Sequence, residues 1–283
     1  MLNGILDRIG ASVTNIPGVE IWVMDPKVRS AEDAKPMPDS QLARVRSVDG
    51  VAWAAPLFKG NLRVRLNDGS FQSAVVIGVD DATFVGGPTE MVAGTLSGLR
   101  YSGGVIVDED SARFRLAQSG PDGRKQPLRI GSTLELNDRR AVVVGICRSV
   151  KTFQSQPVIF TTYQRAAAFS PGERKRLSFI LVKAKPGEAQ QRVAGRISST
   201  TGLKAHTTAV FSEVNRQYFI QETGIIATFL AGIGISFFVG TTICGQTLYN
   251  FTIENLRQFG AIKAMGGSNW TVTSMIVCQA GMV

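Results

Sequence analysis

The chain has 283 residues, of which 44% are hydrophobic and 19% charged, and its formal net charge is +9. This length supplies enough apolar material for one large domain or two ordinary ones. The positive charges are scattered, and their densest clusters, Arg139–Arg140 and Arg174–Arg176, are short and not interleaved with aromatic residues. That distribution argues against a nucleic-acid partner.

Cysteine usage does not identify a compartment. The chain has three cysteines, Cys147, Cys244 and Cys278, and only Cys147 lies in the charged region that forms most of the chain. That region therefore cannot form an internal disulfide. The first ten residues do not resemble a secretory signal, because Asp7 and Arg8 stand where its apolar core would be.

Apolar periodicity and turn residues predict the following elements in the first half of the chain: a helix over 1–16, a strand over 19–26, a helix over 39–50 capped by Asp39 or Ser40, a hairpin over 51–80 turning at Asp68–Gly69, and a glycine-rich segment over 84–103 with a short helix near Met91. The second half predicts a strand then a helix over 103–117, a hairpin over 132–149 turning at Asn137–Asp138, a strand then a helix over 157–169, a strand over 177–187, and helices over 189–199 and 210–222.

Hairpins mixed with helices indicate an α+β domain rather than a regular alternation of strands and helices. We expect this domain to cover residues 17–221. It is predicted to have two lobes, with a strand-rich segment of about 51–149 inserted between two flanking parts that form the other lobe.

An uncharged segment follows this domain. From Thr223 to Ile253 the chain has no Asp, Glu, Lys, Arg or His, a run longer than the ~20 residues that cross a bilayer core. We therefore predict a transmembrane helix over 222–249. Gly232, Ser236 and Gly240 recur every fourth residue, and small residues at that spacing let another helix approach closely in lipid.

The positions of Arg257 and Lys263 after this helix predict that its C-terminal end is cytoplasmic and that residues 17–221 are extracytoplasmic. Crossing the membrane requires a preceding helix, so residues 1–16 are expected to be the end of a missing first transmembrane helix and its connector. Residues 250–270 are predicted to be a cytoplasmic coupling segment. Residues 271–283 are predicted to begin a truncated further transmembrane helix.

Within the coupling segment, apolar residues recur every third position at Ile253, Leu256, Phe259 and Ile262, and Gly266–Gly267 predicts a helix end. Ser268 can cap the next helix. The apolar row could lie on the membrane surface or dock into a groove of a partner.

No catalytic, cofactor or metal site is predicted. His206 is the only histidine, which excludes a histidine metal pair, and the chain has no G-x-x-x-x-G-K-[ST] motif for ATP hydrolysis. Asp108, Glu109 and Asp110 follow a strand and could pair or bind a cation. As consecutive residues they point in different directions, so a capping role for Asp110 or Ser111 is favoured. We expect no enzymatic activity.

The coupling segment carries a family resemblance. ENLRQFGAIKAMGGS, residues 254–268, resembles the segment after the second membrane helix in ABC transporter permeases of the FtsX/MacB type. GVEIWVMDP, AVVIGVD, VIVDED and LSFILVKAKPG resemble the periplasmic domain of the DevC branch, the permeases of heterocyst-glycolipid-type exporters. The chain departs from the family pattern by lacking the first membrane helix, most of the third and all of the fourth.

The resemblance implies a multi-pass permease of the inner membrane, with a two-lobed MacB-like periplasmic domain, that works as a homodimer. A separate ABC ATPase would contact Glu254, Arg257, Phe259 and Lys263, and a periplasmic membrane-fusion adaptor would dock on the outer domain. ATP-driven closure of the dimer would move the periplasmic domains, with residues 210–249 acting as one continuous lever. No cofactor is implied.

Two alternatives remain open. A permease of the same architecture could activate an external partner, such as a cell-wall hydrolase, without moving a solute. A membrane-anchored extracytoplasmic enzyme is disfavoured, because the sequence has no catalytic triad, metal cluster or paired acids.

Overall fold

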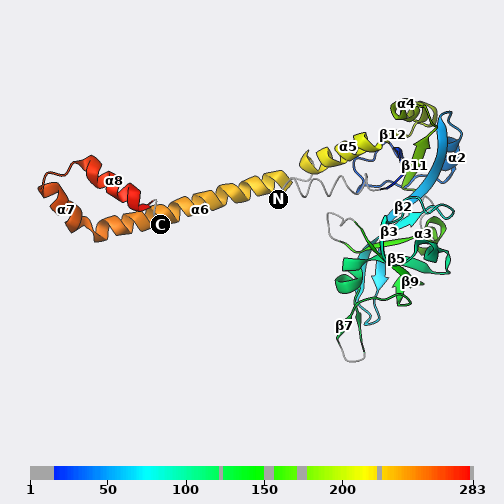
Figure 1. Ribbon diagram of the computed structural model, residues 1–283, viewed down its shortest axis with the longest axis horizontal. Coiled ribbons are helices and arrows are strands. Elements are labelled where there is room, and N and C mark those ends of the chain that lie inside the picture. The colour runs from blue at the N-terminus through cyan, green and yellow to red at the C-terminus, as the bar shows by residue number, and fades with distance from the viewer. Residues whose placement is uncertain (1–15, 121–123, 150–155, 171–176, 222–224, 281–283) are drawn as a thin grey trace. The chain divides into compact units, whose positions relative to one another are not determined.

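A computed structural model describes residues 16–120, 124–149, 156–170, 177–221 and 225–280. The chain forms two compact units, Met1–Tyr218 and Phe219–Val283, which are described separately (Figure 1). The helix expected over residues 1–16 falls almost entirely outside the described residues.

The first lobe of the N-terminal unit is built on an antiparallel sheet in the order β12-β1-β11-β2. Helices α2 and α4 bury Val45, Val193 and Ile197 in a core shared with Ile21 and Ile180 of the sheet. The bounds are Ile21–Met24 for β1, Val51–Arg65 for β2, Phe179–Ala184 for β11, Lys204–Thr207 for β12, Ser40–Arg46 for α2 and Gln190–Thr201 for α4.

The second lobe is a ring of six strands. β2 pairs with β3, β3 with β10, β10 with β5, β5 with β9, β9 with β8, and β8 returns to β2. Alternate side chains of these strands fill the inside, among them Leu62, Val76, Val107 and Leu134. The bounds are Phe71–Val79 for β3, Gly104–Asp108 for β5, Thr133–Leu136 for β8, Arg139–Arg148 for β9 and Val158–Thr162 for β10.

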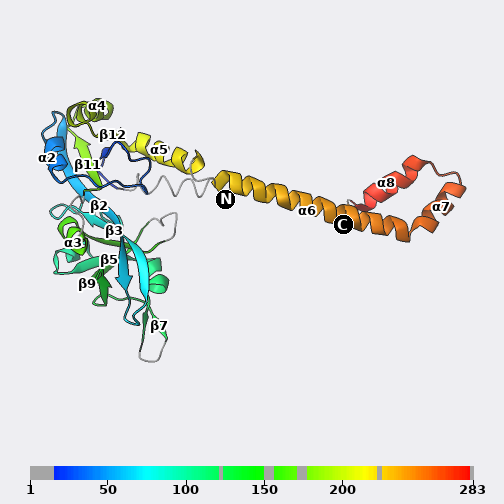
Figure 2. The same ribbon diagram turned by 180° about the vertical axis from the view of Figure 1, so that it is seen from behind.

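Smaller elements complete this lobe. They are β4 (Glu90–Gly94), which pairs with the C-terminal half of β9, the β6–β7 hairpin (Gln118–Ser119 and Lys125–Gln126), the 3-10 helix η1 (Leu96–Arg100), the single π-turn η2 (Ser111–Arg115) and α3 (Tyr163–Phe169). In both views of the unit, α2 and α4 lie at one end and the β7 hairpin lies at the other (Figures 1 and 2).

Strand β2 belongs to both lobes. Its first half, Val51–Leu57, pairs with β11, and its second half, Phe58–Arg65, pairs with β3. The hairpin predicted at Asp68–Gly69 is confirmed, as is the one at Asn137–Asp138, where both residues have positive φ (50° and 64°) as a type I′ turn requires.

Two expectations need correction. The short helix expected near Met91 is wrong, because β4 runs through that position and pairs with β9. The inserted lobe also extends past residue 149, since β10 closes the ring and α3 packs on it. α3 approaches β3 at Gly78, where a Cβ would lie 2.6 Å from the Cβ of Ala166.

The C-terminal unit consists of α6 (Ile225–Glu254), α7 (Leu256–Ala264) and α8 (Asn269–Ala280). Residues Ala227–Glu254 of α6 are long and apolar enough to cross a membrane, and none of this stretch is buried within the protein. The 30 residues of α6 span about 45 Å at 1.5 Å per residue. The predicted end of α7 is confirmed: Gly266 has a φ of 94°, and the Gly267 N–H donates to the Ile262 carbonyl at 3.0 Å.

Helix α5, Thr208–Gln221, confirms the helix predicted before the uncharged segment. Residues 222–224 lie outside the described residues, so the continuity of α5 with α6 stays a prediction.

Candidate functional site

The residues predicted to contact an ATPase lie at the junction of α6 and α7. Glu254 is the last residue of α6, and Arg257, Phe259 and Lys263 lie on α7. Glu254, Arg257 and Lys263 are exposed, and in the described part of the chain none of them forms an ion pair. Phe259 is half-buried. It shares a helical face with Lys263, four residues later, whereas Arg257 projects from another side of α7.

Apolar side chains are also exposed here. Leu256 is 63% exposed, Met265 81% and Trp270 79%. A short helix with exposed apolar and charged side chains next to a membrane-length helix is a suitable surface for a partner protein or for the membrane interface.

The small-residue face of α6 is open. Gly232, Ser236 and Gly240 are all exposed, and a Cβ built on either glycine would meet nothing within 4 Å. Packing of another helix against this face stays a prediction.

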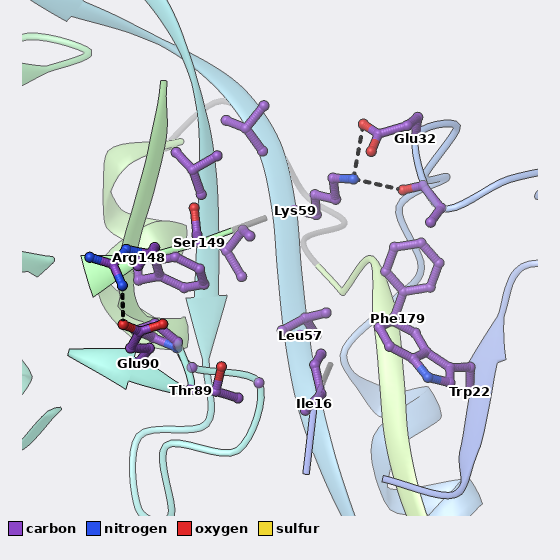
Figure 3. A pocket seen from close by; sticks show the side chains of 18 residues that line it. Ile16, Trp22, Glu32, Leu57, Lys59, Thr89, Glu90, Arg148, Ser149 and Phe179 are labelled. Carbon is purple, nitrogen blue, oxygen red and sulfur yellow. Dashed lines mark hydrogen bonds and ion pairs between the residues drawn. The ribbon is translucent and has the colours of Figure 1, made fainter. Parts of the chain in front are cut away.

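The N-terminal unit contains a cavity of about 400 Å³ between the outer face of the strand ring and the sheet of the first lobe. Its walls are mainly apolar. Ile77 and Phe160 line it from the ring. Trp22 and Phe179 line it from the sheet (Figure 3). Leu57 of the shared strand β2 lies between the two groups.

The charged groups that line the cavity are paired. Lys59 Nζ lies 3.0 Å from Glu32 Oε2 and donates to the Ala31 carbonyl at 2.9 Å. Arg148 forms an ion pair with Glu90 (Figure 3). The lining therefore has two positive and two negative side chains, and its net charge is close to zero.

Aromatic contacts join the cavity wall to α5. The centroid of the Trp22 ring lies 5.5 Å from that of Phe179, in an edge-on arrangement, and 5.5 Å from that of Phe211 on α5, in a tilted one. Asn215, one turn further along α5, accepts the Ala31 N–H at 2.9 Å in a buried position. The Thr208 hydroxyl, at the start of α5, donates to the Val19 carbonyl at 3.0 Å.

Two buried side-chain nitrogens next to this wall have no hydrogen-bond partner among the described residues: Trp22 Nε1 and His206 Nε2. The two residues face each other across β1 and β12, so their side chains emerge on the same face of the sheet. Burial, followed by the nearby charge of Lys204, lowers the pKa of His206.

Asp108, the last residue of β5, accepts backbone hydrogen bonds from two neighbouring segments. Asp108 is 7% exposed; its Oδ1 accepts the Ser149 N–H at 3.1 Å and its Oδ2 accepts the Ser111 N–H at 3.3 Å. The cap expected from Asp110 is wrong, since Asp110 makes no side-chain cap bond to η2. Across the described ranges, no group of three or more His, Cys, Asp or Glu residues is placed to hold a metal ion.

Residues 1–200 match the model of the MacB-like periplasmic core domain. The chain belongs to this family. An uncharacterized ABC transporter permease of Methanocaldococcus jannaschii is 23% identical over 161 residues, which are 55% of this chain and 40% of the relative, so the chain spans less than half of that relative's length.

One solved structure supports the fold of the N-terminal unit. The periplasmic region of MacB from Actinobacillus actinomycetemcomitans is 16% identical, with a TM-score of 0.50 over 73% of this chain and 96% of that one. The extracellular domain of the noncanonic ABC-type transporter YknZ from Gram-positive bacteria is 13% identical, with a TM-score of 0.44 over 67% of this chain and 98% of that one.

The family match assigns residues 1–200 to the MacB-like periplasmic core domain, and the similarity to an ABC transporter permease supports the FtsX/MacB superfamily. The candidate membrane helix α6 follows that domain, as expected for a membrane permease.

The cavity was not anticipated from the sequence. Trp22 and Phe179 read only as alternating strand residues, and Phe211 as part of an ordinary helix. Their convergence depends on β1 pairing with β11 and on α5 returning to the same sheet, which bring Trp22 against residues more than 150 positions later in the chain. A local pattern cannot reveal such pairing, although three large aromatic residues in two predicted strands and a predicted helix were a partial signal.

Proposed function

We propose that this chain is the permease part of an ATP-binding cassette exporter, and that it converts movements of a separate ATPase into movements of the periplasmic domain. The observation that carries the proposal is the order of parts along the chain: the matched core domain, then the membrane-length helix α6, then the short exposed helix α7. Because α6 lies between the core domain and α7, it can transmit a movement of α7 on one side of the membrane to the core domain on the other side.

The attachment of α5 supports the periplasmic half of this proposal. Phe211 and Asn215 join α5 to the first lobe through aromatic and hydrogen-bond contacts, both in buried positions. Near the end of the unit, Arg29 lies over the ring of Tyr218 at 5.4 Å. Because α5 is packed on the lobe over several turns, displacement of the helix would move the lobe with it.

The exposed α7 supports the cytoplasmic half. We propose that Glu254, Arg257, Phe259 and Lys263 contact the ATPase, and that the Gly232, Ser236 and Gly240 face packs against another transmembrane helix of a multi-pass homodimer. A membrane-fusion adaptor is the proposed partner of the periplasmic domain. We also propose that the chain belongs to the DevC-like branch, the permeases of heterocyst-glycolipid-type exporters.

The test uses the complete permease reconstituted in nanodiscs with its ATP-binding cassette subunit. Truncating interface residues that carry binding energy costs 2 kcal/mol or more, which corresponds to roughly a 30-fold loss of affinity. Replacing Arg257 and Phe259 together with Ala should therefore raise the ATPase concentration needed for half-maximal stimulation of ATP hydrolysis by roughly 30-fold or more, without loss of membrane insertion.

Gln258→Ala is the matched control, because Gln258 is an exposed polar residue between the two on the same helix. It should leave stimulation unchanged. An unchanged half-maximal concentration for the Arg257→Ala/Phe259→Ala variant would refute the coupling role of α7.

The second candidate is a signalling permease of the same superfamily that activates an extracytoplasmic partner without moving a solute. The superfamily match supports both functions equally. They differ in the periplasmic partner: capture of a membrane-fusion adaptor by the intact permease favours export, and capture of a cell-wall hydrolase favours signalling.

A further inference from the structure

We propose that residues 25–36 form a strap that couples α5 to the strand ring of the second lobe, with Ala31 as the residue that both elements bind. The inference rests on the proposed function, in which movement of α5 reaches the periplasmic domain. It adds a second route for that movement beside the shared strand β2. The strap is tested without the ATPase, so its failure is distinguishable from a failure of the coupling role of α7.

The strap runs between two fixed points of the first lobe. It begins after β1, which ends at Met24, and it leads to Met37. The Met37 N–H donates to the Leu177 carbonyl at 2.7 Å, and the Met37 carbonyl accepts the Leu177 N–H at 3.3 Å. Residues 25–36, all of which the structure describes, contain no helix or strand. The position of the strap between its ends therefore depends on the contacts of its own residues.

Side chains from two separate elements bind the backbone of Ala31. The Ala31 N–H donates to Asn215 Oδ1 of α5 at 2.9 Å, and the Ala31 carbonyl accepts a hydrogen bond from Lys59 Nζ of β2, also at 2.9 Å. Lys59 lies in the half of β2 that pairs with β3 in the ring, where its register partner is Ile77. One residue of the strap is thus bound by both α5 and the ring.

Both contacts to Ala31 lie in protected positions. Asn215 is 1% exposed, and the Lys59 side chain is 15% exposed. Lys59 Nζ also lies 3.0 Å from Glu32 Oε2 on the next residue of the strap (Figure 3). Hydrogen bonds from a charged donor are stronger than neutral ones, and a buried polar group that loses its partner is costly. The strap should therefore move with both elements rather than separate from either.

Further contacts hold the strap against α5 and β12. The Arg29 guanidinium lies 5.4 Å from the centroid of the Tyr218 ring of α5. Val28 packs in the apolar cluster that contains Phe211 of the same helix, and the Val28 carbonyl accepts a hydrogen bond from Lys204 Nζ of β12 at 3.2 Å. Because the strap is attached to α5 at more than one point, a displacement of this helix should carry the strap with it.

The experiment measures hydrogen–deuterium exchange of the full chain in nanodiscs, without the ATPase. Lys59→Met removes the hydrogen bond to Ala31 and the ion pair with Glu32. We expect peptides covering residues 208–218 of α5 to exchange faster by roughly tenfold to a hundredfold, the effect of one hydrogen bond to a charged group. Peptides from β9, inside the ring, should be unchanged.

Lys35→Met is the matched control. Lys35 belongs to the same strap, its side chain is 47% exposed, and it forms its ion pair with Asp33, which is also on the strap. Exposed ion pairs of this kind contribute little to stability, so exchange of residues 208–218 should not change. If Lys59→Met fails to fold, Lys59→Gln replaces it, because Gln keeps a polar end but is uncharged and one bond shorter.

A double-mutant cycle tests the coupling through Ala31. Asn215→Ala removes the acceptor of the Ala31 N–H and should also accelerate exchange of residues 208–218. If α5 and the ring act on each other through the strap, either substitution already breaks that connection. The Lys59→Met/Asn215→Ala variant should therefore accelerate exchange by less than the product of the two single factors.

Three results would overturn the inference. Unchanged exchange of residues 208–218 in Lys59→Met would mean that the ring contact does not reach α5. Equal acceleration in α5 and β9 would mean that Lys59 stabilises the whole domain. A double variant whose factor equals the product of the single factors would mean that the two contacts act independently. Because no ATPase is present, each result leaves the test of the coupling role of α7 unaffected.

Discussion

Replacing Phe211 with Ala is expected to release α5 from the periplasmic domain while the strand ring stays folded. Phe211 is 1% exposed, and its ring lies 5.5 Å from that of Trp22 and 6.1 Å from that of Phe179. Truncating a buried Phe to Ala costs about 3–5 kcal/mol. α5 has 14 residues, and isolated helices of this length are marginal in water. The helix therefore depends on such packing.

The expected size of the effect follows from these figures. If the substitution lowers only the free energy needed to detach α5 from the domain, the backbone amides of α5 should exchange with solvent faster by roughly 100-fold to a few thousand-fold. Hydrogen–deuterium exchange of the full chain in nanodiscs measures this, with peptides covering residues 208–218 compared with peptides from β9. Exchange in β9, inside the ring, should be unchanged.

Val210→Ala is the control, because Val210 precedes Phe211 on the same helix and is 38% exposed. It should accelerate exchange of α5 only slightly. Equal acceleration in α5 and β9 would mean that Phe211 stabilises the whole domain, and no acceleration would mean that other contacts hold the helix. Either result would refute the reasoning.

Two further predictions concern titratable groups of the periplasmic domain. His206 has a lowered pKa because of burial and then Lys204. The unfolded chain therefore binds a proton more readily below the ordinary pKa of about 6.5, and the domain should lose stability as pH falls from 6.5 toward the folded-state pKa. The melting temperature of His206→Gln, measured between pH 8 and pH 5, should fall less than that of the unmodified chain; identical profiles would contradict this role. Burial, and then the charge of Asp108, raises the pKa of Cys147 to about 12. In a Cys244→Ser/Cys278→Ser variant, Cys147 should resist a water-soluble maleimide at pH 7.5 until the protein is denatured, and labelling of the folded protein would show that its burial is incomplete.

The sequence predicted the local elements well where a strong local signal exists. Asp68–Gly69 and Asn137–Asp138 placed both hairpins correctly, because only a few residue types tolerate positive φ in tight turns. The uncharged run before Glu254 identified α6. The helix predicted near Met91 was wrong because Met91 lies in the short strand β4. This strand forms by pairing with β9 and has no clear alternating pattern of its own.

Local sequence patterns could not predict which strands pair when they lie far apart in the chain. The closing of the ring depends on two residue pairs between β2 and β8, Val64 with Leu136 and Arg65 with Glu135. The position of β10 in the ring, parallel to β3, likewise joins segments about 80 residues apart. The cavity exists only because these pairings set the ring against the first sheet, so none of its residues could be grouped from the sequence.

The sharing of β2 has a mechanical consequence. Its 15 residues extend about 50 Å at 3.3 Å each, and ladder bonds fasten it on one half to β11 and on the other to β3. Bending between the lobes would require breaking those bonds or distorting a continuous backbone. A displacement of α5 is therefore expected to move the two lobes together, because neither lobe can turn against the other without deforming β2.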